Sequence, residues 1–117
     1  QILAQIPNTC KCIIVDFHAE ATSEKAALAR FLDGRVTAVF GTHTHVQTAD
    51  AKILPNGSAM ITDVGMVGAE VSILGRSVED VIRKFRTGMP CRLNVVDDGI
   101  RFDGAVLTYD YNTGKAV

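Results

Sequence analysis

The chain has 117 residues, of which 47% are hydrophobic and 21% charged, and its formal net charge is −1. These values are typical of a soluble globular protein with one hydrophobic core, so we expect a single domain over residues 1–117. Lys and Arg form no cluster that would bind a nucleic-acid backbone, and the apolar runs are too short to span a bilayer. We therefore expect no membrane partner and no stable nucleic-acid complex.

The chain contains three cysteines, an odd number that argues against a closed disulfide framework. Cys10 and Cys12 form a Cys-x-Cys pair, but no second pair is present to complete a zinc knuckle. No signal peptide is visible either, so free thiols in a reducing cytoplasm are the favoured interpretation.

The chain does not open on Met, and its first residues, Gln1 to Ile6, resemble the end of a helix. This start predicts a fragment of a longer protein, with a processed or trimmed chain as the alternative. A fragment of a larger fold would expose apolar sheet faces and edges, so we expect association with the remainder of the protein or with another copy.

The first elements in the chain predict a strand, a helix and a second strand. Residues 12–17 form a largely apolar run without alternation, which predicts a strand buried on both faces. Thr22 or Ser23 is expected to cap a helix that ends at Gly34. Its apolar face is expected to comprise Leu28, Phe31 and Leu32. Residues 36–40 predict the second strand, and this βαβ order favours a parallel pair with a right-handed crossover.

All three histidines of the chain follow the ends of these two strands. His18 follows the first strand, and His43 and His45 lie in the segment Gly41–His45 after the second. In a βαβ unit both places lie at the carboxyl-terminal edge of the sheet, where open α/β sheets bind ligands. If the backbone stays extended, the last two imidazoles project from one face, roughly 7 Å apart. The pattern predicts a metal site, the alternative being three histidines that bind no metal.

The second half of the chain predicts further strands and a second helix. Two short strands are expected around a turn at Pro55, over residues 52–54 and 58–62. A helix is expected to start after Ser77 and to end at Gly88, with a buried stripe of Val78, Val81, Ile82 and Phe85. Residues 92–96 and 100–109 predict a C-terminal hairpin.

Three imidazoles suit zinc, manganese, iron or nickel. They can form one open site with water as the fourth ligand, or half of a two-metal site that clamps phosphoryl groups. A two-metal site also needs bridging carboxylates, for which Asp63 is the only candidate after a later strand. Asp16 is placed to orient an imidazole, the alternative being a solvated carboxylate at a strand end.

Three motifs of the chain resemble one family. They are Asp-Phe-His-Ala-Glu-Ala-Thr-Ser-Glu-Lys at residues 16–25, Gly-Thr-His-Thr-His-Val-Gln-Thr-Ala-Asp at residues 41–50, and Ile-Thr-Asp-Val-Gly-Met at residues 61–66. Together they resemble the YmdB-type branch of the calcineurin-like metallophosphoesterases. The resemblance extends over nearly the whole chain and indicates the carboxyl-terminal portion of such a protein.

The resemblance implies an α/β fold that forms part of a four-layer α/β/β/α sandwich, with a βαβ unit and the C-terminal hairpin. It also implies hydrolysis of phosphodiesters, with 2′,3′-cyclic nucleotides as substrates, by a hydroxide activated by two metal ions. The expected cofactors are two divalent metal ions, iron or manganese first and zinc as an alternative.

The resemblance carries over to individual residues of this chain. His18 and His43 match two ligands of one metal, and His45 matches a ligand of the other. The flanking residues expected to orient these ligands or to contact the substrate are Asp16, Glu20, Thr42 and Thr44. No catalytic residue is expected in this chain, because the His that protonates the leaving group belongs to the missing N-terminal half. That half is therefore an expected partner, together with the small phosphodiester substrate.

Two other interpretations stay open. A different hydrolase is one. It is either a mononuclear metal hydrolase, because His-x-His after a strand also opens the metal site of amidohydrolase barrels, or a member of a related capsule-synthesis branch of metallophosphatases, which has a similar His-containing loop. A non-catalytic metal-binding or regulatory domain is the other. Tight metal binding without turnover of a model phosphodiester would favour the second.

Overall fold

A computed structural model describes residues 1–117, and the chain forms a mixed α/β structure, as predicted. Two compact units make up the chain: residues 1–65 together with 104–117, which we call unit 1, and residues 66–103, which we call unit 2. The elements in chain order are η1 (Ile2–Gln5), β1 (Ile14–His18), α1 (Thr22–Leu32), β2 (Ala38–Thr42), β3 (Lys52–Ile53), β4 (Ala59–Ile61), β5 (Val67–Ala69), α2 (Val78–Thr87) and β6 (Ile100–Phe102). Neither α-helix has the length and continuous hydrophobicity needed to cross a bilayer.

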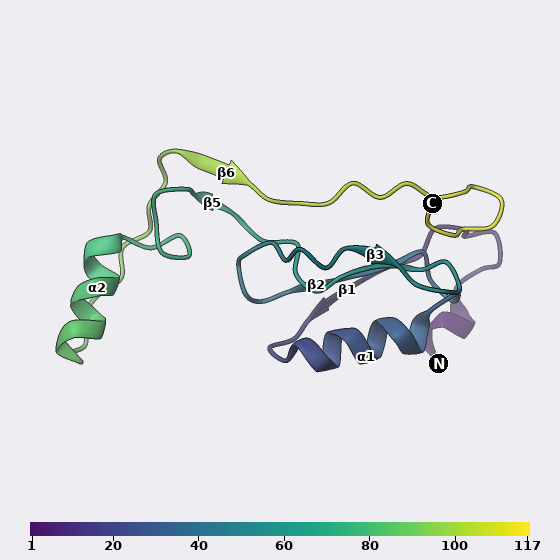
Figure 1. Ribbon diagram of the computed structural model, residues 1–117, viewed down its shortest axis with the longest axis horizontal. Coiled ribbons are helices and arrows are strands. Elements are labelled where there is room, and N and C mark those ends of the chain that lie inside the picture. The colour runs from purple at the N-terminus through teal and green to yellow at the C-terminus, as the bar shows by residue number, and fades with distance from the viewer. The chain divides into compact units, whose positions relative to one another are not determined.

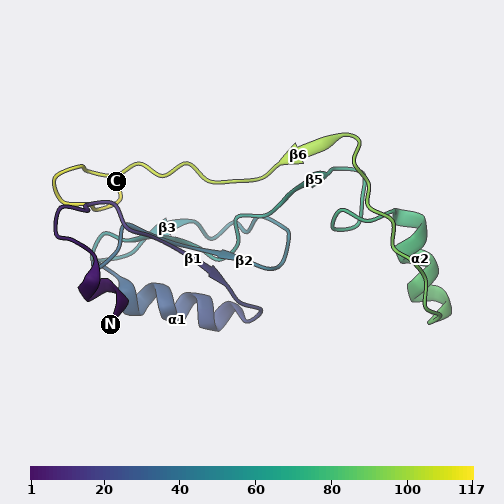
Figure 2. The ribbon, with the colours of Figure 1, turned by 180° about the vertical axis from the view of Figure 1, so that it is seen from behind.

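Unit 1 is built on a four-stranded sheet in the order β1-β2-β4-β3. The first three of these strands are parallel, and β3 pairs antiparallel with β4 at the edge. The predicted βαβ unit is confirmed by the parallel pairing of β1 with β2 on either side of α1 in the chain. Helix α1 lies along one face of this sheet in both ribbon views (Figures 1 and 2).

The core of unit 1 lies between α1 and the sheet. Ala29 and Leu32 of the helix pack with Val39 of β2 and Met60 of β4, and all four side chains are buried. These side chains remove apolar surface from water, which is the main favourable term in folding. The same contacts hold the helix against the sheet.

The prediction that the first strand is buried on both faces is wrong. Burial alternates along β1, and Ile14 is 52% exposed. Val15 and Phe17 pack against the core, whereas the other residues of the strand point to the opposite face. The reason is that β1 is the outer strand of the sheet and α1 covers one face only.

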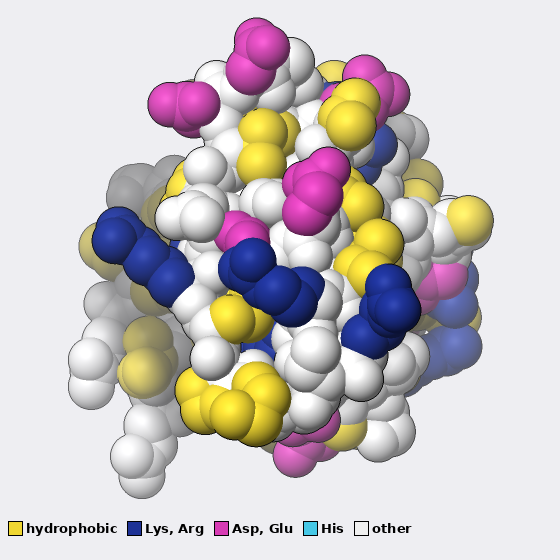
Figure 3. Space-filling model, turned by 90° about the vertical axis from the view of Figure 1, so that its left-hand side faces the viewer, with side chains coloured by type: hydrophobic (Ala, Val, Ile, Leu, Met, Phe, Trp, Pro, Cys, Tyr) yellow, Lys and Arg dark blue, Asp and Glu magenta, His cyan; other side chains and the backbone are white.

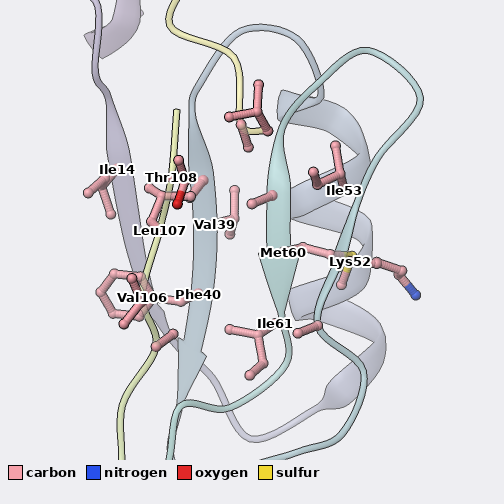
Figure 4. A pocket seen from close by; sticks show the side chains of 16 residues that line it. Ile14, Val39, Phe40, Lys52, Ile53, Met60, Ile61, Val106, Leu107 and Thr108 are labelled. Atoms are coloured by element: carbon pink, nitrogen blue, oxygen red, sulfur yellow. The ribbon is translucent and has the colours of Figure 1, made fainter. Parts of the chain in front are cut away.

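The uncovered face of the sheet bears an apolar groove of about 410 Å³ (Figure 4). Ile14, Phe40 and Ile61 contribute to it from β1, β2 and β4, and Val106 and Leu107 contribute from the C-terminal segment. None of the three histidines lines this groove. It is therefore separate from the polar groups at the carboxyl-terminal edge of the sheet.

Helix α1 differs from its prediction in its cap and in its buried face. Its N-cap is Ala21, which makes no side-chain cap hydrogen bond, so neither Thr22 nor Ser23 has the predicted role. The buried residues are Lys25, Ala29 and Leu32, spaced four and three apart. Phe31 is 70% exposed and lies beneath the guanidinium of Arg35, whose central carbon is 5.3 Å from the ring centroid. The buried stripe is therefore centred on Ala29.

Unit 2 contains α2, whose ends agree with the prediction. The Ser77 hydroxyl accepts a hydrogen bond from the Asp80 N–H, and Gly88 ends the helix with φ of 66°. The predicted buried stripe is wrong for most of its length, because Val81 is buried but Ile82 and Phe85 are 46% and 83% exposed. On the face drawn in Figure 3, hydrophobic side chains lie among Lys, Arg, Asp and Glu side chains, and no His side chain is visible.

The predicted C-terminal hairpin is also wrong. Strand β6 pairs antiparallel with β5, and residues 92–96 form only an isolated bridge. The backbone of Asn94 is occupied elsewhere, because its N–H donates to Asp80 and its carbonyl accepts from the Ser77 N–H. Val96 likewise donates to the carbonyl of Gly75. Residues 92–96 thus have no free ladder of backbone groups to offer to β6.

Candidate metal centre

The candidate site lies where the parallel strands of unit 1 end. His18 is the last residue of β1 and pairs in register with Thr42, the last residue of β2. His43 follows directly in the chain. The prediction that His18 and His43 share the carboxyl-terminal edge of the sheet is confirmed by this register. The parallel pairing is the reason, since it places the ends of two strands separated by a whole helix side by side.

The rings of His18 and His43 face each other. Nε2 of His18 lies 3.2 Å from Nδ1 of His43, and the ring centroids are 5.1 Å apart with the planes at 77°. Both residues are exposed. Two nitrogen ligands about 2.1 Å from one tetrahedral metal ion lie about 3.4 Å apart. The observed separation of these two nitrogens therefore fits a pair of ligands to one ion.

Two of the predicted flanking residues hold the ring of His18. Nδ1 of His18 lies 3.0 Å from the Thr42 hydroxyl, and that hydroxyl donates to a carboxylate oxygen of Asp16 at 3.5 Å. A threonine hydroxyl that donates its proton to Asp16 has its lone pairs available to accept a hydrogen bond from Nδ1 of His18. In the tautomer with the proton on Nδ1, Nε2 of His18 has a free lone pair directed toward His43. A metal ligand requires that tautomer.

The backbone between the last two histidines is not extended, so the condition under which two imidazoles would project from one face is not met. His43 has φ of 136° and His45 has φ of 65°, values rarely adopted by residues other than glycine. Each such residue costs of order 1–3 kcal/mol and persists where the surrounding structure holds it. His45 is exposed and lies beyond the facing pair, and no group of three or more His, Cys, Asp or Glu side chains close enough to hold a metal occurs in the chain.

The remaining predicted flanking residues, Glu20 and Thr44, make no hydrogen bond to the facing rings. The hydroxyl of Thr44 donates to the carbonyl of Val46 at 3.1 Å, so it closes its own loop. Glu20 is exposed after β1. Asp16 and Thr42 are therefore the two flanking residues that the structure joins to a histidine, and they act on His18.

Sequence reasoning missed a buried polar cluster beneath this loop. Asp63 follows β4 and is completely buried, and Lys25 of α1 is 2% exposed. The Lys25 ammonium donates to Oδ2 of Asp63 at 3.2 Å, and the Thr44 N–H donates to the same oxygen at 2.8 Å. The signal was present in the sequence, because Lys25 shares a helical stripe with the core residues Ala29 and Leu32. A cation in such a stripe requires a buried partner.

Asp50 holds the end of β4 in the same region. Its carboxylate accepts from the Thr62 N–H at 3.1 Å, from the Thr62 hydroxyl, and from the Thr48 hydroxyl at 2.6 Å. Burial alone raises the pKa of Asp50, but these hydrogen bonds outweigh it and the net pKa lies below the ordinary 3.8. Asp50 is therefore an ionised carboxylate that fixes the backbone just before Asp63.

The donor set at the edge suits a divalent transition metal. The imidazoles of His18 and His43 face each other, and a third imidazole is two residues further along the chain. The Asp16 carboxylate is linked to His18 through the Thr42 hydroxyl. Imidazole nitrogen is a ligand for zinc, iron and manganese, and a metal-binding His commonly has its other nitrogen hydrogen-bonded. His18 meets that second requirement through its contact with Thr42.

A family model described as YmdB-like protein matches residues 1–117. The chain is 50% identical over 117 residues to the 2′,3′-cyclic-nucleotide 2′-phosphodiesterase of Bacillus subtilis (strain 168). This match covers 100% of this chain and 44% of that protein. Over 113 residues it is 48% identical to a putative phosphatase/phosphodiesterase of Mycoplasma pneumoniae, covering 96% of this chain and 40% of that protein. The chain thus spans less than half the length of these curated relatives.

Two solved structures have the same fold over nearly the whole chain. A hypothetical protein from Thermus thermophilus matches with a TM-score of 0.88 and 44% identity, covering 99% of this chain and 44% of that one. A structure described as a novel phosphatase from Mycoplasma pneumoniae matches with a TM-score of 0.88 and 44% identity, covering 99% of this chain and 41% of that one.

Proposed function

The chain belongs to the YmdB-like family, and from this membership we propose that it is the carboxyl-terminal part of a metal-dependent phosphodiesterase. The observation that carries the proposal is the facing pair His18 and His43, with 3.2 Å between two ring nitrogens at the carboxyl-terminal edge of the sheet. The substrate class is the 2′,3′-cyclic nucleotides, since the relative from Bacillus subtilis is named as a phosphodiesterase of these compounds.

The cofactors we propose are two divalent metal ions, iron or manganese first and zinc as the alternative. His18 and His43 would hold one ion and His45 the other. When bound, such ions supply positive charge that stabilises the phosphoryl oxygens, and they make water nucleophilic near neutral pH. Within this chain, Thr42 and Asp16 keep the His18 ring in the tautomer and orientation that present Nε2.

The proposed site is completed by the part of the protein that precedes this chain. Three imidazoles are too few for two metal ions, and the relatives are more than twice as long as this chain. We propose that the preceding part supplies the bridging carboxylate, the other ligands and the proton donor to the leaving group. It would also supply the second sheet of a four-layer sandwich and cover the apolar groove around Phe40 and Ile61.

The first experiment is the metal content of the complete protein, measured by plasma mass spectrometry beside the 117-residue chain. About two equivalents in the complete protein, and one or fewer in the chain, are expected for a site divided between the two halves. One equivalent in both would replace the proposal with a mononuclear three-His site.

The second experiment tests the histidines one at a time in the complete protein. His18→Ala, His43→Ala and His45→Ala should each lower the metal content and abolish hydrolysis of 2′,3′-cyclic AMP, with unchanged circular dichroism. Arg83→Ala is the matched control, because this side chain is 60% exposed in unit 2. Metal binding without turnover of the cyclic nucleotide or of bis-p-nitrophenyl phosphate would indicate a binding or regulatory domain instead.

A further inference from the structure

Asp63 is the most completely buried carboxylate in the chain, with 0% of its surface exposed. Both of its oxygens are used: Oδ2 accepts from the Thr44 N–H at 2.8 Å and from Lys25 at 3.2 Å, and Oδ1 accepts from the Gly65 N–H at 3.0 Å. A carboxylate enclosed in this way is not offered to a metal at the surface. It acts instead on the backbone that surrounds it.

The backbone it holds is the strained part of the candidate site. Thr44 lies between His43 and His45, which both have positive φ. Its N–H is the group that donates to Asp63 across 19 positions of sequence. Conformations of this kind persist only where neighbouring groups over-determine them. The Asp63 carboxylate is thus bonded at the centre of the strained segment.

The main chain around Asp63 ties the same loop at its two ends. The Val64 N–H donates to the carbonyl of Gly41 at 3.0 Å, before the histidines. The Thr48 N–H donates to the carbonyl of Asp63 at 3.0 Å, after them. With the bond from Thr44, the loop is therefore fixed to the segment after β4 at its start, its middle and its end.

Lys25 reaches this carboxylate from α1 through a space that only glycine leaves open. A Cβ at Gly41 would collide with the carbonyl oxygen of Thr62 and would lie 2.7 Å from Cδ of Lys25. The Lys25 side chain is 2% exposed, and its ammonium lies 3.2 Å from Oδ2 of Asp63. A buried charge without a partner is costly, so the pair balances two charges that would otherwise destabilise the fold.

We propose that Asp63 is a positioning residue that sets the conformation of the loop carrying His43 and His45, and that Lys25 neutralises its charge. The metal affinity of His43 and His45 then depends on the hydrogen bond from the Thr44 N–H to Asp63. This inference rests on the proposed function of the site. Asp63 acts through the loop and touches neither ion nor substrate. Burial raises the pKa of Asp63, but the N–H groups of Thr44 and Gly65 and the Lys25 ammonium together lower it by more. The net pKa lies below its ordinary value, so the carboxylate is ionised at neutral pH.

The test uses Asp63→Asn, Lys25→Met and the double variant in the complete protein, with Asp80→Asn of unit 2 as the matched buried-aspartate control. An asparagine at position 63 has one acceptor oxygen in place of two, so it can no longer satisfy both the Thr44 and the Gly65 N–H groups. We measure the Mn²⁺ dissociation constant by calorimetry and the melting temperature by circular dichroism. Asp63→Asn should weaken Mn²⁺ binding by about 10- to 100-fold, the range seen for groups that orient metal ligands.

The double variant separates positioning from stability. Because it removes both buried charges, its melting temperature should exceed that of Asp63→Asn, whereas its Mn²⁺ binding should stay as weak. Lys25→Met alone should lower the melting temperature but weaken Mn²⁺ binding less than Asp63→Asn does. Recovery of Mn²⁺ affinity together with melting temperature in the double variant would overturn the proposal, as would unchanged affinity in Asp63→Asn.

A readout on the metal-free protein keeps this test independent of the proposed function. In protein labelled with ¹⁵N-threonine, the Thr44 amide should exchange with solvent faster in Asp63→Asn than in the parent protein, and should not change in Asp80→Asn. If the parent protein binds none of Mn²⁺, Fe²⁺ and Zn²⁺, the phosphodiesterase proposal fails. The positioning role is then decided by amide exchange alone, and an unchanged Thr44 amide in Asp63→Asn overturns it.

Discussion

Each unit of the chain contains one α-helix and a buried aspartate that forms an ion pair from or to that helix, but the two ion pairs differ in how far they are buried. In unit 1, Asp63 and its partner Lys25 have side-chain exposures of 0% and 2%. In unit 2, Asp80 is 10% exposed and its partner Arg83 is 60% exposed at 2.7 Å. Water can solvate the second cation if its partner is lost, but it cannot reach the first.

The helices differ in the same way. Helix α1 places Ala29 and Leu32 against a sheet, whereas α2 leaves Phe85 83% exposed. Helix α2 has a side-chain cap at Ser77, and α1 has none. Helix α1 is therefore stabilised mainly by tertiary packing, whereas local hydrogen bonds make a larger relative contribution to the stability of α2. Four changes test this contrast, and their expected effects decrease from the first to the last.

Removal of the buried carboxylate should have the largest effect. Asp63→Ala leaves the Lys25 charge buried and two N–H groups without acceptors, so we expect a loss of about 3–5 kcal/mol in the free energy of unfolding. Urea denaturation of the complete protein, followed by circular dichroism, measures it. Asp80→Ala is the comparison and should lose less, because water reaches Arg83. Equal losses in the two variants would contradict the contrast between the units.

Truncation of a core side chain should come next. Leu32→Ala removes a side chain that is 8% exposed between α1 and the sheet, and we expect a loss of about 2–3 kcal/mol. Phe85→Ala in α2 should change stability by no more than about 0.5 kcal/mol, as surface substitutions do. The same urea titration compares them. A loss at Phe85 as large as that at Leu32 would mean that α2 is covered in solution.

The helix caps should give a smaller effect of opposite sign in the two helices. Ser77→Ala removes the acceptor of the Asp80 N–H and should lower stability by about 1 kcal/mol. Ala21→Ser introduces a side-chain acceptor at the cap of α1, where φ is −76° and ψ is 124°, and should raise stability by about 0.5–1 kcal/mol. Thermal unfolding of both variants is the measurement. No gain from Ala21→Ser would show that packing alone sets the start of α1.

The sequence predicted the features that depend on local pattern. Alternation of strand and helix predicted the parallel pair, and its register then placed His18 beside Thr42 and His43. The cap at Ser77 followed from residue type. These features are encoded within a few residues, so they can be read without knowledge of the rest of the fold.

Two of the errors concern contacts between distant segments. The hairpin failed because Asp80 and Ser77 occupy the backbone of Asn94, which is 14 positions from Asp80. The predicted buried face of α1 included Phe31, which is exposed, and omitted Lys25, which is buried because Asp63 pairs with it across 38 positions. A period of 3.6 residues predicts which residues share a stripe, but not which charged residue in that stripe has a buried partner.

The smallest expected effect is the acid dependence that the two aspartates contribute. The net pKa of Asp63 is lowered, because its hydrogen bonds outweigh the effect of burial, and that of Asp80 is lowered by the N–H and the side chain of Asn94 and by Arg83. A carboxyl with a lowered folded-state pKa stabilises the fold fully above its ordinary pKa of 3.8, and this contribution is lost as pH falls below that value. At Asp63, burial raises the pKa and the hydrogen bonds lower it, so only the difference between these two effects contributes to the pH dependence of stability. Asp63→Asn and Asp80→Asn should each make the fall in melting temperature between pH 5 and pH 3 shallower, and a steeper fall in either variant would contradict the direction of its pKa shift.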